Sequence, residues 1–251
     1  MESVISMDKD ELLERYEALG ADDDFLAAKP LFEAEIQRRE QSETGLHGLA
    51  DALLLRQYGY LLNCHGRITI RRAIEQYQRS IDLSDDDDQV QYMWTGAKAT
   101  LDEAGDAVTR YRKRADAAPG DTRELRFLAH ACLAAQDFDA AKGVIDAGLA
   151  LAPDDAVLTE HRGDVKAHEG DVDRALTDWR RAHELYPENF SPVYSSAFLL
   201  DQEGRLAEAI EAWRLILDNA TEHGWELTAA WPRQEIQRLQ GQLEKRKDPS
   251  G

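Results

Sequence analysis

Between residues 170 and 187 the apolar side chains recur at the pitch of an α-helix, and charged side chains occupy the intervening positions. A Gly-Asp pair precedes this stripe and a proline follows it, and such residues mark turns and helix ends. The segment is therefore predicted to be an amphipathic helix bounded by turns. Its apolar residues are Val172, Ala175, Leu176, Trp179 and Ala182.

The same pattern returns along the chain at an interval of 34 residues. The prolines at this interval are Pro119, Pro153 and Pro187. The small residues, twelve positions earlier, are Ala107, Ala141 and Ala175, and their column continues to Ala209. The bulky residues four positions after each alanine are Tyr111, Ile145, Trp179 and Trp213. The turn residues five positions before the later alanines are Gln136, Gly170 and Gly204. Several columns with one period predict a repeat protein.

Each period contains two helical stretches separated by a turn. The first, over 156–168 for example, follows a Pro-Asp-Asp segment in which an aspartate can accept hydrogen bonds from the exposed helix amides. The second carries the alanine and the bulky residue of the columns. Small alanines let two helices approach closely, and the bulky side chain fills the adjacent space. We therefore predict stacked helical hairpins.

The period and its columns resemble the tetratricopeptide repeat. We assign four repeats, 88–121, 122–155, 156–189 and 190–223, and an earlier one over 52–87 with Gly59, Gly66, Ala73 and Tyr77 in its columns. That earlier repeat needs two extra residues, which we place in its turn around Arg67–Arg72. The chain departs from the family pattern in three ways: no tryptophan occupies the usual fourth place of a repeat, Arg162 and Ser196 replace a common leucine, and Thr221 replaces the last proline. The resemblance implies an all-α, right-handed superhelical solenoid of helix-turn-helix repeats with helical caps.

Both ends are predicted to cap the repeats. Residues 1–51 suggest a helical hairpin from helices over 8–19 and 25–40. Within 224–251, a final helix is expected from Pro232 to about Lys245, because proline suits the first position of a helix. Its apolar side would cover the last repeat, as a solenoid requires. We expect the tail EKRKDPSG to be disordered.

Composition narrows the functional classes. The formal net charge of the 251 residues is -19, so nucleic acid and anionic membrane surfaces are disfavoured as partners. The chain has no apolar run long enough to span a membrane, and its first residues do not look like a secretory signal. Cys64 and Cys132 lie far apart and outside any paired motif, which suggests buried thiols in a reducing cytoplasm.

In the tetratricopeptide family the first helix of each hairpin lines the concave side, which implies a groove that binds a protein or peptide segment. Arginines and tyrosines dominate its amino-terminal half and carboxylates its carboxy-terminal half, so a segment with both charge signs, or with aromatic and carboxylate groups, would suit it. The carboxylate clamp of some family members is not expected, because Tyr60, Met93 and Phe127 stand at three of its five places. The expected partner-binding residues are Arg56, Tyr60, Asn63, Tyr92, Arg123, Arg126, His130, Glu160, Asp164, His168, Tyr194, Phe198 and Asp201.

One alternative is an enzyme or a small-molecule or metal binder. His161, Asp164 and His168 fall roughly on one side of a helix, with His130 one repeat earlier, and imidazole and carboxylate groups can hold zinc. Chance alignment of seven histidines is the simpler interpretation, and HExxH and other catalytic or cofactor motifs are missing from the sequence. We expect no catalysis, no metal and no cofactor. The acidic run SDDDD at 84–88 lacks the spacing of a calcium loop and is expected to cap the helix near Gln89.

A second alternative is a structural protein that self-associates. Trp225 and Trp231 are expected to pack between the last repeat and the final helix. If both rings are exposed instead, they would mark a docking patch or a contact between copies of the chain.

Overall fold

The computed structural model describes residues 24–41, 46, 51–52, 54–56, 58–59 and 67–247. Its regular elements over these residues are helices alone, and the predicted fold class, an all-α solenoid of helical repeats, is confirmed. Within the same part of the chain, no helix combines the length and apolar character needed to cross a membrane. The chain divides into two compact units, Met1–Arg112 and Lys113–Gly251.

Unit 1 contains the helices α2 (Asp24–Glu40), α4 (Arg67–Leu83), α5 (Asp88–Thr100) and the first part of α6 (Ala104–Ala117). The predicted helix over 8–19 lies outside the described residues, as do Gly66 and Cys64. The ring of Tyr77 is fully buried and fills the space beside Gly59, where a Cβ atom would collide with it. Glycine is therefore required at the closest approach between these two segments.

The turn predicted around Arg67–Arg72 is wrong, because these residues form the start of α4. The helix has 17 residues, whereas α6 has 14, so the extra length of this repeat is accommodated within the helix. The segment is helical because Ile70, Ala73 and Tyr77 are spaced at helical pitch. All three are buried and form one apolar stripe.

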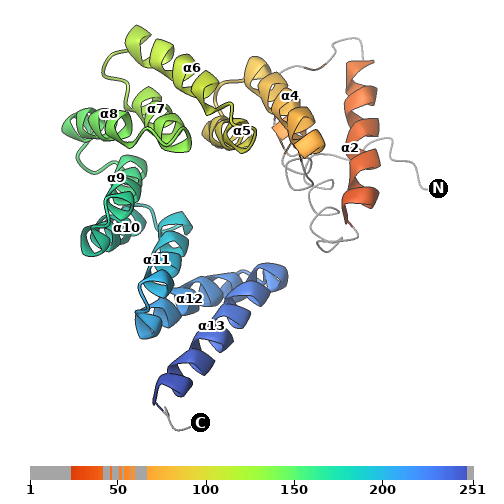
Figure 1. Ribbon diagram of the computed structural model, residues 1–251. Helices are drawn as coiled ribbons and strands as arrows, with labels where there is room; N and C mark the ends of the chain where they lie inside the picture. The colour runs from red at the N-terminus through yellow and green to blue at the C-terminus, as the bar shows by residue number, and fades with distance from the viewer. Residues whose placement is uncertain are drawn as a thin grey trace. The chain divides into compact units, whose positions relative to one another are not determined.

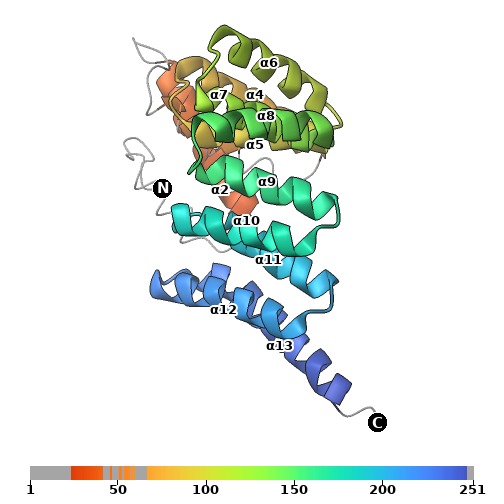
Figure 2. The same ribbon diagram turned by 90° about the vertical axis from the view of Figure 1, so that its left-hand side faces the viewer.

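Unit 2 is a stack of antiparallel helical hairpins (Figures 1 and 2). Neighbouring helices along the chain contact each other throughout the stack, and Figure 2 shows them as successive layers. Helix α9 has the bounds predicted for the first helix of its hairpin. After the last part of α6, the helices are α7 (Thr122–Ala134), α8 (Phe138–Leu151), α9 (Ala156–His168), α10 (Val172–Leu185), α11 (Ser191–Gln202), α12 (Leu206–Glu222) and α13 (Glu226–Lys247).

Aspartates begin most of these helices. Asp155, for example, accepts a hydrogen bond from the Leu158 amide at 3.0 Å, which satisfies one of the donors left unpaired at the start of α9. The acidic run at 84–88 acts in the same way, as predicted, because Asp87 caps α5 by accepting from the Gln89 amide at 3.1 Å. The other capping aspartates are Asp121, Asp137 and Asp171.

In the four hairpins between α5 and α12, the turn places one residue in the left-handed region, at the 34-residue interval seen in the sequence. The residues are Asp102, Gln136, Gly170 and Gly204, with φ between 59° and 79°. Glycine adopts this conformation without steric cost, and other residues pay a small penalty. The turn column therefore reflects a requirement for left-handed backbone. At two of the four positions, Asp102 and Gln136, a residue other than glycine adopts this conformation.

In both units the core follows the alanine column. Ala107, Ala141, Ala175 and Ala209 have no exposed surface, so each lies where two helices approach most closely. In α9 the closest position is Gly163, where a Cβ atom would stand 2.6 Å from two atoms of the buried Trp179 ring. The absence of a side chain at residue 163 leaves room for the Trp179 ring, one of the two tryptophans of the bulky column.

The last helix begins earlier than predicted. Helix α13 starts at Glu226 and contains Pro232, which was expected to be its first residue. The chain leaves α12 through Gly224, at φ +70°, and the Trp225 carbonyl then accepts a hydrogen bond from the Ala229 amide, which starts the new helix. Residues 244–247 of the predicted disordered tail belong to α13, and residues 248–251 lie outside the described part of the chain.

The contact between Gly163 and Trp179 predicts the effect of one added methyl group. We expect Gly163→Ala to lower the free energy of unfolding, because about 1–3 kcal/mol of overpacking exceeds the gain of about 1 kcal/mol in helix propensity. Gly143→Ala in α8 is the matched control, since nothing lies within 4 Å of its Cβ position, and it should gain about 0.5–1 kcal/mol. Urea denaturation of both variants measures the difference, and equal stability would contradict the packing.

Candidate partner-binding surface

The predicted partner-binding residues of unit 2 lie on the first helix of each hairpin, α7, α9 and α11. Several of their polar groups bind neighbouring helices. Arg126 on α7 donates a hydrogen bond from Nε to Asp155 at 2.6 Å, and the Asp155 side chain is only 1% exposed. Because Asp155 also caps α9, this ion pair connects α7 to the start of the next hairpin. Arg126 therefore has a structural role as well as its proposed contact with a partner.

Glu160 on α9 is buried and accepts a hydrogen bond from the Asn189 side chain at 2.8 Å. Burial raises the pKa of its carboxyl group above the usual value of 4.5. A hydrogen bond from Ser191, the His161 ring and the bond from Asn189 act in the opposite direction, while the nearby Asp164 carboxylate adds to the increase. The carboxyl group connects α9 to the segment that begins α11.

The histidines of the proposed metal site are separated by other contacts. Asp164 accepts a hydrogen bond from the Trp179 indole at 3.0 Å and lies 3.4 Å from Nδ1 of His161. The His130 ring stacks on His161, with ring centroids 5.5 Å apart, whereas His168 stacks on Phe138. Among the described residues, no group of three histidine, cysteine, aspartate or glutamate side chains is arranged to hold a metal ion. The metal-binding alternative therefore gains no support from the geometry.

The remaining polar candidates also have partners inside the protein. Asp201 on α11 accepts a hydrogen bond from Arg238 of α13 at 2.6 Å. The Arg123 guanidinium lies over the buried Phe127 ring, 5.1 Å from its centroid. In unit 1, Arg56 donates to Asp87, at the start of α5. Tyr92 is half-buried on α5, and the predicted sites Tyr60 and Asn63 lie outside the described residues.

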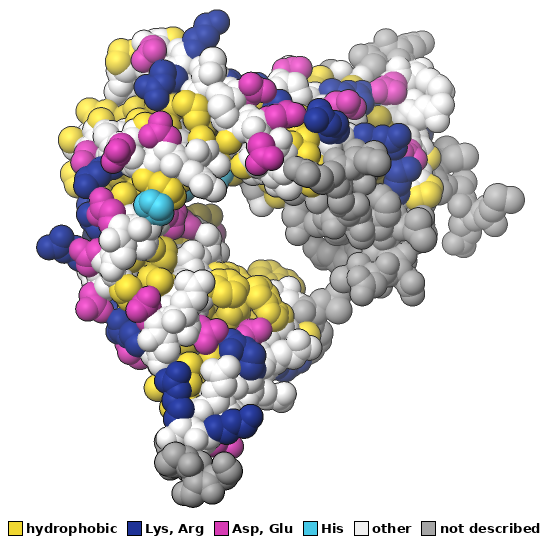
Figure 3. Space-filling view, in the orientation of Figure 1, with side chains coloured by type: hydrophobic (Ala, Val, Ile, Leu, Met, Phe, Trp, Pro, Cys, Tyr) yellow, Lys and Arg dark blue, Asp and Glu magenta, His cyan; other side chains and the backbone are white. Residues whose placement is uncertain are grey.

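The aromatic candidates of unit 2 remain accessible and form a cluster. Tyr194 and Phe198 of α11 meet Trp231 of α13, and we call these three residues the aromatic platform. Phe198 and Trp231 are 43% and 44% exposed, and Tyr194 is half-buried. Tyr194 stacks on Trp231 at 5.9 Å between ring centroids, and Phe198 lies 5.6 Å from the same ring. Figure 3 shows hydrophobic side chains gathered on the surface of unit 2 near α12 and α13.

Trp213 of α12 supports the platform from below. This ring is 1% exposed and meets the rings of Tyr194, Phe198 and Trp231 at centroid distances of 5.8, 5.3 and 5.1 Å. All three contacts are edge-on, which is a favourable arrangement of aromatic quadrupoles. A rigid layer of rings therefore has one face in the core and one face toward solvent.

A cavity of about 510 Å³ adjoins the platform at Tyr194. It lies between the starts of α11 and α13 and the end of α12, and its lining includes Phe190, Ile216 and Trp225. Trp225 is 52% exposed and stacks on His223. Trp225 and Trp231 were expected to pack in the core, but about half of each side chain is exposed, so this expectation is wrong. The alternative of an exposed docking patch describes them better.

The repeat register predicted Tyr194 and Phe198 as partner-binding residues, but it did not predict this role for Trp231. Trp231 lies outside the repeats, directly before Pro232, so the register gives no position for it. The early start of α13 brings its ring onto α11. The exposure of the two tryptophans distinguishes a docking patch from core packing, and this exposure is visible only in the structure.

Solved structures share this fold. TTC0263, a thermophilic TPR protein in Thermus thermophilus, matches 74% of this chain and 98% of its own, with a TM-score of 0.56 and 19% identity. A chain of the APC/C hetero-tetramer Cut9-Hcn1 matches 92% of this chain and 48% of its own, with a TM-score of 0.54 and 14% identity. No protein-family model and no curated protein matches the sequence. At these identities the likeness is one of fold.

The raised pKa of Glu160 predicts a pH-dependent effect of Glu160→Gln. Because the folded-state pKa lies above the unfolded value, the stability associated with the protonated carboxyl is present below about pH 4.5 and is lost as the pH rises through the folded pKa. The glutamine variant does not titrate and keeps an oxygen for Asn189. We therefore expect its melting temperature, relative to the parent, to be higher at pH 7 than at pH 4.

The exposed Glu184→Gln variant on α10 is the matched control, measured by the same thermal melts. If Glu160→Gln shows no pH-dependent difference beyond that of the control, the carboxyl group is not destabilised by its burial.

Proposed function

Because the chain has the tetratricopeptide-repeat fold, we propose that it is a non-catalytic protein-interaction module, and that the aromatic platform of unit 2 is the centre of its binding surface. The single observation that carries this proposal is the layer of half-exposed rings held over the buried Trp213. As a scaffold, an adaptor or a chaperone-like protein, it would bind a segment of another protein. Cysteines outside any paired motif favour a cytoplasmic location for this role.

The chemistry of the platform suits protein recognition. Tyrosine and tryptophan are enriched among the residues that dominate binding energies, because they bury large areas with few rotatable bonds. Trp213 fixes the platform from below, so little conformational entropy is lost when a partner binds. The rings are therefore prepared to bury a bulky apolar side chain of the partner.

Polar groups at the edge of the platform form a rim that can fix the orientation of a bound segment. The Trp231 indole donates to Glu235 at 3.3 Å, and Arg238 pairs with both Glu235 and Asp201. These charges surround an apolar centre, which is the usual arrangement of a protein interface. We propose that the partner segment contributes an aromatic or aliphatic anchor to the centre and polar groups to this rim.

The other predicted contact residues keep a secondary place in the proposal. Arg126 and Glu160 already bind Asp155 and Asn189, so a partner would have to compete for them. Breaking such contacts leaves a buried polar group without a partner, which costs about 1–3 kcal/mol. A partner can bind the platform without breaking an internal polar contact. The platform is therefore favoured as the energetic centre of binding.

Selection from a displayed library of random 12-residue peptides on the intact protein tests the proposal. We expect the enriched peptides to carry a bulky apolar residue and to bind the parent in calorimetry. Phe198→Glu should weaken that binding by about 30-fold or more, because loss of an energetic centre costs at least about 2 kcal/mol. Phe198 is half-exposed, so the protein should remain folded, and circular dichroism checks this.

Leu151→Glu, at the exposed end of α8, is the matched control and should bind the peptides as the parent does. Peptides that bind Phe198→Glu and the parent equally would place the interaction elsewhere.

The half-exposed Trp231 also favours a second candidate function, self-association. Sedimentation velocity at several concentrations distinguishes the two, because a dimer that dissociates in Trp231→Ser would assign the platform to contact between copies.

A further inference from the structure

A polar contact recurs at one register position of the repeats. In three of the repeats assigned from the sequence, the fifth residue shares a hydrogen bond of 2.6 to 3.0 Å with the last residue of the same repeat. The contact therefore joins the same two positions although the residue types differ. The pairs are Arg126 with Asp155, Glu160 with Asn189 and, in unit 1, Arg56 with Asp87.

The last repeat, 190–223, lacks this contact. Its fifth residue is Tyr194 and its last residue is His223, and no hydrogen bond joins them. Nδ1 of His223 instead donates to the Asn219 carbonyl of α12 at 2.9 Å. Both Tyr194 and His223 line the cavity of about 510 Å³ that adjoins the aromatic platform. The cavity therefore lies where earlier repeats have an internal polar pair.

Three aromatic side chains, Phe190, Tyr194 and Trp225, line this cavity. The His223 ring stacks on Trp225, with ring centroids 4.7 Å apart and an angle of 25° between the planes. Trp225 is 52% exposed, and Phe190 and Tyr194 are half-buried, so each ring keeps surface that another molecule can contact. The face of an aromatic ring attracts a cation. The rings therefore suit a positively charged ligand.

The same lining carries hydrogen-bond acceptors. The Glu188 carboxylate, in the turn before α11, makes no ion pair or hydrogen bond with the described residues. The Tyr194 hydroxyl also has no hydrogen bond to any of them. Because Nδ1 of His223 donates to a carbonyl, Nε2 of the neutral ring is an acceptor. The cavity therefore offers a carboxylate, a hydroxyl and an imidazole nitrogen to a ligand with several donors.

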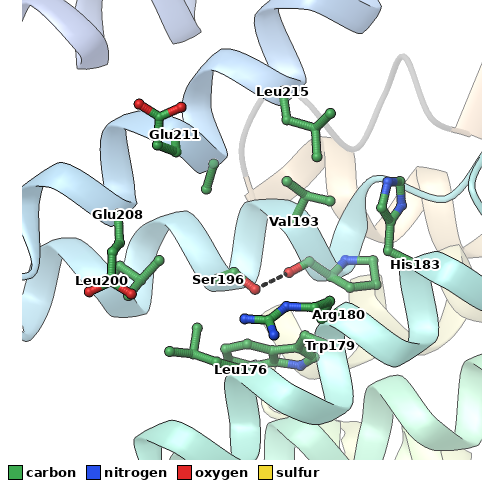
Figure 4. Close-up of a pocket in the computed structure, with 12 residues that line it drawn as sticks. Leu176, Trp179, Arg180, His183, Val193, Ser196, Leu200, Glu208, Glu211 and Leu215 are labelled. Atoms are coloured by element: carbon green, nitrogen blue, oxygen red, sulfur yellow. Dashed lines mark hydrogen bonds between the residues drawn. The ribbon is translucent and has the colours of Figure 1, made fainter.

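The protein supplies no cation of its own to this cavity. Among the described residues that line it, none is a lysine or an arginine. The cavity of about 350 Å³ between α10, α11 and α12 differs, because Arg180 lines it and Figure 4 shows the Arg180 guanidinium beside Ser196. On α7 the Arg123 guanidinium lies over the Phe127 ring, 5.1 Å from its centroid. The rings at the larger cavity therefore lack a kind of partner that other rings of the chain have.

An anion is a poor ligand for the same place. Anions bind at helix starts through free backbone amides. At the start of α11 the Ser191 amide already donates to the Asn189 side chain at 3.0 Å, and Pro192 has no amide proton. The Glu188 carboxylate and the net charge of -19 also repel an anion. Charge therefore favours a cationic ligand.

We propose that this cavity binds an arginine side chain of another protein. The planar guanidinium stacks on aromatic faces and is less strongly hydrated than the ammonium group of lysine. It lies against the exposed ring of Trp225, and its N–H groups donate to the Glu188 carboxylate and the Tyr194 hydroxyl. The site goes beyond the aromatic platform, because it shares only Tyr194 with the platform and recognises charge instead of an apolar anchor.

Two-dimensional NMR of the intact protein at neutral pH tests the proposal with N-acetyl-arginine methylamide as the probe. We expect saturable shifts of the Trp225 indole N–H and of the Ile216 and Ala220 methyl groups, which line the cavity. The citrulline derivative has nearly the same shape without the charge, and it should bind at least about fivefold more weakly. The lysine derivative should bind about threefold more weakly, and the glutamate derivative should cause no shifts.

Matched variants assign the shifts to this cavity. Glu188→Gln keeps the shape and removes the charge, so it should weaken binding of the arginine probe by about twofold to fivefold. Glu184→Gln, on α10 and outside the cavity lining, is the control and should bind as the parent does. Trp225→Leu removes the ring and should weaken binding by about threefold or more. Glu188 and Trp225 are exposed, so both variants should remain folded, which circular dichroism checks.

The proposal fails if the arginine probe causes no saturable shift of these groups, or if the citrulline derivative binds as tightly. It also fails if Glu188→Gln binds the probe as well as Glu184→Gln does. Shifts that depend on protein concentration without any probe would show that another copy of the chain occupies the cavity, which contradicts the proposed occupant. The probe carries no bulky apolar residue, so its failure would leave the proposed role of the platform to the peptide selection.

Discussion

Unit 2 depends on one kind of contact, in which a residue with little or no side chain lies beside a bulky ring or aliphatic group. The fully buried Ala141, Ala175 and Ala209 and the contact between Gly163 and Trp179 are its main examples. Close approach of the helices buries apolar surface that a single hairpin would expose, and each buried methylene contributes about 0.8 kcal/mol. The hairpins are therefore stable as members of a stack.

Stacking also decides what the first helices of the hairpins can do. Where neighbouring hairpins meet, polar side chains such as Arg126 and Glu160 must be satisfied, and they bind Asp155 and Asn189 of the next element. Where the stack ends at α13, the rings of α11 have no further repeat to cover them. The accessible chemistry of unit 2 is therefore concentrated in aromatic side chains near its carboxy-terminal end.

The sequence predicted the helices well because the fold repeats a local rule. Period, caps and turn residues are encoded within each hairpin, and Asp87, Asp155 and Gly170 act as expected. The errors occurred where the register is interrupted. Arg67–Arg72 became helix because the apolar stripe continues, and α13 began before Pro232 because Gly224 had already turned the chain.

The candidate surface was harder to predict than the fold. The register correctly placed Tyr194 on the first helix of its hairpin, but it could not show that Asp201 would bind Arg238 of α13. Such pairs join residues that are far apart in the sequence, and their formation depends on the geometry of the stack. The same limit applies to Ser196, whose small size was visible in the sequence although the cavity above it was not.

Native-state hydrogen exchange tests most directly whether each hairpin is held chiefly by its neighbours. Leu239 of α13 is fully buried, and Leu239→Ala should destabilise its surroundings by about 2–5 kcal/mol. If coupling passes only between adjacent hairpins, exchange should accelerate most in α11, α12 and α13 and hardly at all in α7 and α8. Equal acceleration in all these helices would show a single cooperative core and would contradict the account.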